Sequence, residues 1–172
     1  MKKAFAVLLA VALILVFGAC GQSEDETDSS QLPNPVVEVT GSEDFEALGF
    51  TIHAPENAEN VQYSIIADTI AQIDFTLSGR SYTYRAAQTD EDISGVYETF
   101  DETEQSLEAD GTDWSASVRM RTIGGGDNGA LATWSFGETQ YSLYTADAVD
   151  ADSIGSVALA LANTDFPRGG SD

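Results

Sequence analysis

The chain is poor in the residue types that many enzymes and metal sites use. Its 172 residues include one cysteine and one histidine. A single cysteine cannot form an intramolecular disulfide, and one cysteine with one histidine cannot build the usual zinc sites. A serine triad would depend on His53 alone, and the chain contains no Gly-x-Ser-x-Gly elbow. We therefore expect His53 to be an ordinary, half-exposed histidine and the protein not to be an enzyme.

Basic residues are scarce as well. Seven Lys and Arg residues stand against 29 Asp and Glu residues, for a formal net charge of −22. A surface with this charge repels nucleic-acid phosphates and anionic lipid headgroups. We expect no nucleic-acid partner, whereas cations and basic peptides are compatible with the charge.

The first twenty residues have the layout of a bacterial lipoprotein signal. Lys2 and Lys3 precede an apolar run over 4–17, which ends at Gly18-Ala19-Cys20. That run is shorter than the about 20 residues of a membrane-spanning helix. We predict cleavage between Ala19 and Cys20 and a diacylglycerol lipid with fatty-acyl chains of the palmitate kind on Cys20. The mature protein is then lipid-anchored on the outer, extracytoplasmic face of the cell membrane.

The remaining chain divides by composition into three parts. Residues 20–35 are acidic and rich in serine with two prolines, as expected of a flexible tether. Residues 36–166 alternate apolar and polar positions and predict a single domain. Residues 167–172 predict a disordered tail.

Alternation with a period of two predicts the strands of this domain. Ile73, Phe75 and Leu77 share one face of a strand, with polar residues between them. The same alternation recurs over 82–86, 116–121, 130–136 and 141–144. Short links such as Ser78-Gly79 and Gly137-Glu138 predict antiparallel neighbours. We expect an α+β fold with an antiparallel β-meander sheet of six or seven strands.

Two helices are predicted beside the sheet. A short N-terminal helix over 42–49 would have Ser42 as its N-cap and Gly49 as its stop, and would bury Phe45 and Leu48. A C-terminal helix follows Asp150, and its apolar residues have i, i+3, i+4, i+7 spacing: Ile154, Val157, Ala158 and Leu161. We expect this helix to pack on the apolar face of the sheet.

Several segments resemble a family of uncharacterised lipoproteins, mostly from Gram-positive bacteria, in which a tether leads into a small α+β domain. The resembling segments are Asn34–Val39, Glu46–Phe50, Ile70–Ile73, Tyr82–Ala86, Glu91–Gly95, Ala132–Trp134 and Tyr141–Tyr144. The resemblance implies a cell-surface lipoprotein of unknown function and transfers no catalytic residue. It favours a Gram-positive surface over a periplasmic leaflet, which the residues themselves leave open.

The arginines are the most selective candidates for ligand binding because the chain has so few. Arg119 and Arg121 fall on the polar face of one strand, and Arg85 falls on that of another. If these strands are close, the three form a positive patch for a carboxylate or phosphate. The alternative, which the composition favours, is that each arginine pairs with surrounding acids.

Carboxylates in a predicted loop are candidates for a metal site. Asp90, Glu91 and Asp92 are consecutive, and calcium prefers several oxygen ligands of this kind. Their spacing does not match an EF-hand loop, so a solvated acidic loop is the favoured alternative. The many acids also allow a carboxylate-dependent hydrolase, but no spacing rule selects a pair.

Two further patterns have a structural and a functional interpretation. The Gly124–Gly129 segment is as rich in glycine as a phosphate loop, but it lacks the lysine and the following helix. We expect it to be a hairpin tip. Five aromatic residues are expected first in the core and second in an apolar cleft: Tyr82, Tyr84, Trp134, Phe136 and Tyr141.

These observations favour a non-catalytic, membrane-anchored lipoprotein whose domain binds a surface protein or a small ligand. Two alternatives follow from the same residues. The first is a carrier of a lipid or other apolar ligand in a sheet–helix cleft. The second is a hydrolase that uses a pair of carboxylates.

Overall fold

The structure, a computed structural model, describes residues 36–110 and 115–166. The predicted signal peptide, Cys20, the tether and the tail beyond residue 166 lie outside the described residues. Within the described ranges, no helix is long and apolar enough to cross a membrane.

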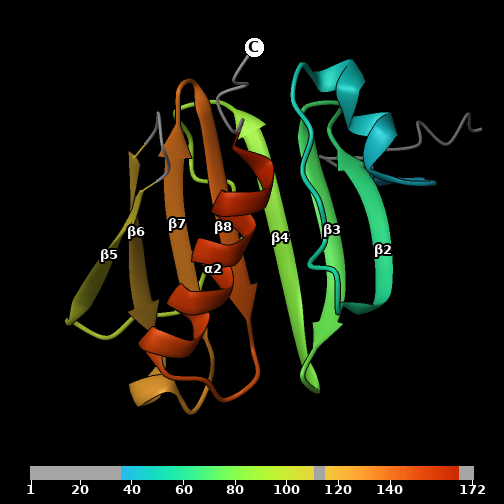
Figure 1. Ribbon diagram of the computed structural model, residues 1–172. Coiled ribbons are helices and arrows are strands. Elements are labelled where there is room, and N and C mark those ends of the chain that lie inside the picture. The colour runs from blue at the N-terminus through green and yellow to red at the C-terminus, as the bar shows by residue number, and fades with distance from the viewer. Residues whose placement is uncertain (1–35, 111–114, 167–172) are drawn as a thin grey trace, which may run out of the picture. The chain divides into compact units, whose positions relative to one another are not determined.

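Eight strands in the described ranges form one antiparallel sheet (Figure 1). They are β1 (Val36–Val39), β2 (Glu59–Ile66), β3 (Ile70–Leu77), β4 (Arg80–Gln88), β5 (Glu104–Asp110), β6 (Ser115–Thr122), β7 (Ala130–Phe136) and β8 (Thr139–Thr145). Their order in the sheet is β1-β2-β3-β4-β8-β7-β6-β5. Two four-stranded meanders therefore meet where β4 pairs with β8.

The expectation of six or seven strands in one meander was too low. The strands without an alternating pattern, β1 and β5, are the two edges of the sheet. Val36 and Val37 are 59% and 50% exposed, and in β5 Leu107 is partly buried against the core. Edge strands are commonly short or charged, which weakens the apolar alternation: β1 has four residues, and β5 carries Glu104, Glu108 and Asp110.

The strand faces follow the predicted alternation. One row of paired residues crosses five strands on the apolar face: Ile73, Tyr84, Leu143, Ala132 and Met120. Each of these side chains is at most 1% exposed. The hairpin link Ser78-Gly79 is also confirmed, since both residues have positive φ, 52° and 79°. Such φ values fit the twist of a two-residue hairpin turn.

Helix α2 (Ala151–Asp165) packs on the apolar face over β5, β6 and β7 (Figure 1). Asp150 caps its start by accepting a hydrogen bond from Ser153 N–H at 2.7 Å. The predicted apolar face is confirmed, because Ile154, Ala158 and Leu161 are at most 1% exposed. The α+β class and the C-terminal helix are thus shown.

The N-terminal helical segment differs from the prediction. Residues Ser42–Leu48 form η1, a 3-10 helix, not an α-helix, and its N-cap is Gly41. The side chain of Asp44 reaches back and accepts the Thr40 N–H at 2.9 Å, which holds a tight turn. Gly49 does end the segment, with φ of 87°. Phe45 is buried as expected, whereas Leu48 is only partly buried.

The five aromatic residues belong to the core. Tyr84 stacks on Trp134 with 5.8 Å between ring centroids, and Trp134 stacks on Tyr141 at 5.5 Å. Tyr82 is 4% exposed, and Phe136 is partly buried and stacks on Phe166 at 4.4 Å. The first of the two interpretations, a packed aromatic core, is therefore the one that the structure supports.

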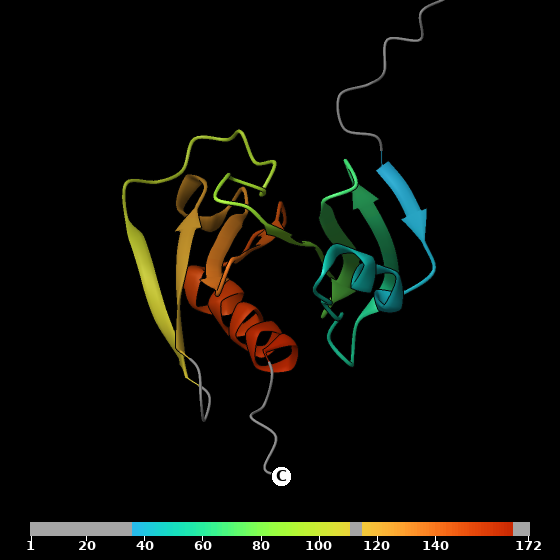
Figure 2. The same ribbon diagram turned by 90° about the horizontal axis from the view of Figure 1, so that it is seen from above.

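The connection from β4 to β5, residues 89–103, crosses the opposite face of the sheet (Figure 2). It reaches from the middle of the sheet to the far edge, because β8, β7 and β6 lie between these two strands. Ile93 and Ser94 are buried by this crossing, at 6% and 4% exposed. One face thus carries α2 and the other carries this loop.

Candidate ligand-binding site

The strand register aligns polar side chains on the face that the loop crosses. Gln72 pairs with Arg85, Arg85 with Ser142, Ser142 with Thr133, and Thr133 with Arg119. These residues form one row across β3, β4, β8, β7 and β6. The sheet order alone creates this row, because β8 is inserted between β4 and β7.

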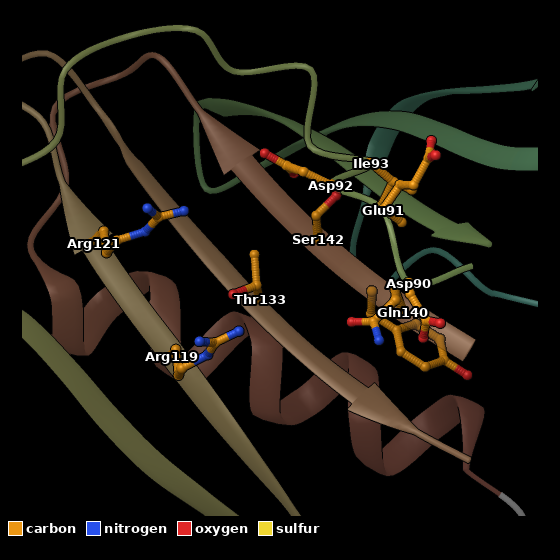
Figure 3. A pocket seen from close by; sticks show the side chains of 10 residues that line it. Asp90, Glu91, Asp92, Ile93, Arg119, Arg121, Thr133, Gln140 and Ser142 are labelled. Carbon is orange, nitrogen blue, oxygen red and sulfur yellow. The ribbon is translucent and has the colours of Figure 1, made fainter. Parts of the chain in front are cut away.

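A hollow of about 250 Å³ lies between this row and the loop. Figure 3 shows it from close by, with side chains from β6, β7, β8 and the loop around it. It is lined by Asp90, Glu91, Asp92, Ile93, Arg119, Arg121, Thr133, Gln140, Tyr141 and Ser142. The lining is mostly polar, which suits a charged or hydrogen-bonding ligand.

Arg119 and Arg121 lie together on one side of the hollow. Both guanidinium groups point toward β7 (Figure 3). Neither forms an ion pair with a carboxylate of the described residues. The guanidinium carbon of Arg121 lies 4.1 Å from the ring centroid of Phe100, which holds this side chain in place. Pairing with surrounding acids, the favoured alternative, is therefore not found for these two arginines within the described ranges.

Arg85 has a different role from the one predicted for it. Its Nε donates to Gln72 Oε1 at 2.7 Å, and its Nη1 donates to the carbonyls of Ile93 and Ser94 at 3.1 and 2.9 Å. Burial lowers the pKa of Arg85, while the charges of nearby acids, chiefly Asp74, act in the opposite direction. Arg85 is a clamp that holds the loop on the sheet.

The three arginines consequently do not form one patch. Arg85 and Arg119 occupy the same row, but β8 and β7 separate their strands. At about 4.8 Å per strand spacing, their Cα atoms are roughly 14 Å apart. The positive patch has two members, Arg119 and Arg121.

The predicted metal ligands do not converge. Figure 3 shows Glu91 turned away from the arginines, Asp92 turned toward them, and Asp90 beside Gln140. In residues 36–110 and 115–166, no three His, Cys, Asp or Glu side chains form a group that could hold a metal ion. Asp92 Oδ1 instead accepts the Ser94 N–H at 2.9 Å and shapes the loop. Calcium binding at this loop remains a prediction.

The glycine-rich segment is a hairpin tip, as expected, and contains the short 3-10 turn η2 (Gly124–Gly126). The Gly125 N–H donates to Asp101 Oδ2 at 2.9 Å, and the Thr122 hydroxyl donates to the same oxygen at 2.6 Å. These two hydrogen bonds lower the pKa of Asp101, the Thr122 bond contributing most. The Asp101 carboxylate thus already accepts the Gly125 N–H that a phosphate would need.

His53 is part of a second polar constellation. Its Nδ1 lies 2.8 Å from Asp165 Oδ1, and its side chain is 50% exposed, as the sequence suggested. The Asp165 side chain is fully buried and also accepts a hydrogen bond from the Tyr84 hydroxyl at 2.7 Å. Among the described residues, no serine or threonine hydroxyl is hydrogen-bonded to the imidazole, so the arrangement is not a serine triad.

No protein-family model, curated protein or solved structure matches this chain. The function must therefore be inferred from the site itself. The hollow by β6, β7 and β8 is the stronger of the two constellations, because it combines open space with two arginines that lack an acid partner.

Sequence patterns did not identify three residues of this site: Thr133, Gln140 and Ser142. Alternation placed Thr133 and Ser142 on the polar side of predicted strands, a signal that is common to every exposed strand face. Gln140 lies just before the predicted strand 141–144 and had no such signal. Only the pairing of β7 with β8 brings Thr133 beside Ser142. No local signal in the sequence specifies this pairing as part of a site.

Proposed function

We propose that this protein is a lipid-anchored, extracytoplasmic lipoprotein whose domain binds a small oxyanionic ligand at the hollow. The ligand carries a carboxylate or a phosphate group that Arg119 and Arg121 bind through their forked N–H donors. The role is binding without catalysis. The lipid anchor is proposed from the Gly18-Ala19-Cys20 sequence and the apolar run that precedes it.

The observation that carries the proposal is the absence of a described acid partner for two arginines in a chain of net charge −22. Arg119 and Arg121 are two residues apart on one strand, so their Cα atoms are roughly 7 Å apart and both side chains project from the same face. Two like charges at that spacing repel each other. A bound oxyanion would offset that repulsion and use donors that the described acids leave open.

The surroundings add donors and enclosure. The hydroxyls of Thr133 and Ser142 and the amide of Gln140 line the same hollow. Ser142 is 2% exposed, so its hydroxyl lies at the bottom of the site rather than in bulk water. The loop over the site, residues 89–103, has no regular secondary structure. Connections of this length in small domains are commonly functional.

The two alternative functions lack a comparable observation. A carrier would need open space beneath α2, where Tyr84, Trp134 and Tyr141 stack on one another. A hydrolase would need a carboxylate or a histidine beside a place for substrate. The lining of the hollow includes acids and two arginines. Arginine does not serve as the acid–base partner that a catalytic carboxylate would need.

Titration of the full-length protein in detergent with succinate and with phosphate tests the binding function. We expect the Nε–Hε NMR signals of Arg119 and Arg121 to move with saturation, while that of Arg80 stays in place. Arg80 is the internal control because its Nε donates to the Ala148 carbonyl at 3.0 Å, away from the hollow.

Variants locate the binding. The double variant Arg119→Gln/Arg121→Gln should lose the saturable response, and Arg80→Gln should keep it. If neither anion moves the signals of Arg119 and Arg121, or if the double variant binds as the parent does, the proposed function is wrong.

A further inference from the structure

The hollow has opposite charges on its two sides. Arg119 and Arg121 lie on β6, and the acids Asp90 and Asp92 lie on the loop across from them. Thr133 and Ser142 are between the two sides (Figure 3). A simple anion would be attracted by the arginines and repelled by the loop, so the acidic side needs its own explanation.

The acidic side is held in place. Arg85 binds the carbonyls of Ile93 and Ser94, and Asp92 accepts the Ser94 N–H with one carboxylate oxygen. Figure 3 shows the Asp92 carboxylate turned toward the arginine side. The carboxylate nevertheless forms no ion pair with either arginine. The two charged sides are kept apart with space between them.

We propose, on the basis of the proposed function, that the ligand of this site is a zwitterion of short-peptide size. Its carboxylate is bound by Arg119 and Arg121, and its ammonium group lies beside Asp92. The hydroxyls of Thr133 and Ser142 bind the polar groups between the two ends. This arrangement explains the acidic side, which an oxyanion site alone does not require.

The volume of the hollow and the separation of the two charges in the ligand indicate its size. The hollow offers about 250 Å³, whereas a single water needs only about 10–15 Å³ of such space. A free amino acid carries both charges on one carbon, so its ammonium and carboxylate groups lie close together. A dipeptide spans roughly 7 Å, at about 3.5 Å per residue. A dipeptide therefore places its two charges on opposite sides of the hollow more readily than a single amino acid does.

The test is a calorimetric titration of the full-length protein in detergent with four probes. They are L-alanine, Ala-Ala, N-acetyl-Ala-Ala, which lacks the cation, and Ala-Ala-amide, which lacks the carboxylate. We expect Ala-Ala to bind best and each capped dipeptide to bind at least tenfold more weakly. Asp92→Asn keeps an oxygen acceptor for the Ser94 N–H and should remove most of the difference between Ala-Ala and its acetylated form.

Glu98→Gln is the matched control, since it removes the same charge from the same loop outside the lining of the hollow. It should keep the preference for the free amine. If acetylated and free Ala-Ala bind equally well, the zwitterion inference is wrong while the oxyanion site stands. If Ala-Ala does not bind but succinate or phosphate does, the inference again fails alone. If none of these ligands binds, both proposals fail.

Discussion

The Tyr84 hydroxyl donates a hydrogen bond to Asp165 Oδ2 at 2.7 Å, across 81 positions of sequence. It joins the middle of the sheet to the last residue of α2. The other carboxylate oxygen of Asp165 accepts the backbone N–H of His53 at 3.0 Å. One buried carboxylate thus ties together the sheet, the helix and the segment between η1 and β2.

The first prediction concerns the pH dependence of stability. Burial raises the pKa of Asp165 to about 6, although the hydrogen bonds from Tyr84 and His53 act to lower it. The folded protein therefore holds a proton that the unfolded chain has lost. As pH rises from about 4 to about 6, this group should lower the free energy of unfolding by roughly 2 kcal/mol.

Asp165→Asn removes the titrating group and should remove this part of the slope in urea denaturation at pH 4, 5, 6 and 7. Asp152→Asn, an exposed position on the same helix, should keep the slope of the parent. Parallel profiles for the parent and Asp165→Asn from pH 4 to 6 would show that burial does not perturb this carboxyl.

The second prediction concerns the lipid anchor. Cys20→Ala removes the thiol that would receive the diacylglycerol, so the protein should leave the membrane fraction and lose fatty-acid labelling. The melting temperature of the domain should not change, because Cys20 precedes the described residues. A variant that stays in the membrane fraction after alkaline extraction would contradict the lipoprotein proposal.

The sequence predicted the parts of the fold that rest on local periodicity. The apolar faces of β3 and β4 and the buried stripe of α2 follow from spacing alone, as do the hairpin links. The edge strands β1 and β5 gave a weaker signal, since β1 has only four residues and three of the seven residues of β5 are acids. The insertion of β8 between β4 and β7 had no local signal either, because it depends on the long connection 89–103.

The candidate site was predictable only in part. Scarcity and alternation identified Arg119 and Arg121, and the structure brings both to one hollow. The same reasoning placed Arg85 with them. In the structure Arg85 lies beneath the loop 89–103, where it donates to the backbone carbonyls of Ile93 and Ser94. The sequence predicts residue type and strand face. It does not predict how many strands separate Arg85 from Arg119.

The third prediction tests the packing of α2. Leu161 lies on the buried face of α2 and is 1% exposed. Leu161→Ala should therefore lower the free energy of unfolding by roughly 2–5 kcal/mol. Leu159→Ala, at a partly buried position of the same helix, should cost less. Denaturant melts of both variants provide the comparison. A near-zero effect at Leu161 would contradict the observed packing.

The fourth prediction separates backbone conformation from steric fit at two hairpin glycines. Gly129 and Gly137 both have positive φ, 107° and 60°. A Cβ at Gly137 meets nothing within 4 Å, whereas one at Gly129 would overlap the Thr145 carbonyl and lie 2.9 Å from Ala146 Cα. Gly137→Ala should cost roughly 1–2 kcal/mol.

Gly129→Ala should cost roughly 1–3 kcal/mol beyond that, because the neighbouring backbone cannot move away as a side chain can. Thermal melts of the two variants under the same conditions make the comparison. Equal losses at the two positions would mean that the backbone near Thr145 gives way.

The last prediction concerns the clamp that shapes the site. Arg85→Ala removes the donor to the Ile93 and Ser94 carbonyls, which are buried with the loop. Leaving buried acceptors without a donor costs roughly 1–3 kcal/mol. The Ser94 and Val96 N–H groups, now bound to Asp92 and to the Ser94 hydroxyl, should exchange with deuterium faster in the variant.

Ligand affinity should fall in the same variant although Arg119 and Arg121 are intact, because the acidic side of the hollow is no longer held opposite them. Arg85→Lys keeps the charge without the fork and should give an intermediate exchange rate. Arg80→Ala serves as the control, since Arg80 donates to Ala148 outside the loop. Unchanged protection of Ser94 and Val96 in Arg85→Ala would show that the loop is held by other contacts, and that Arg85 does not position the site.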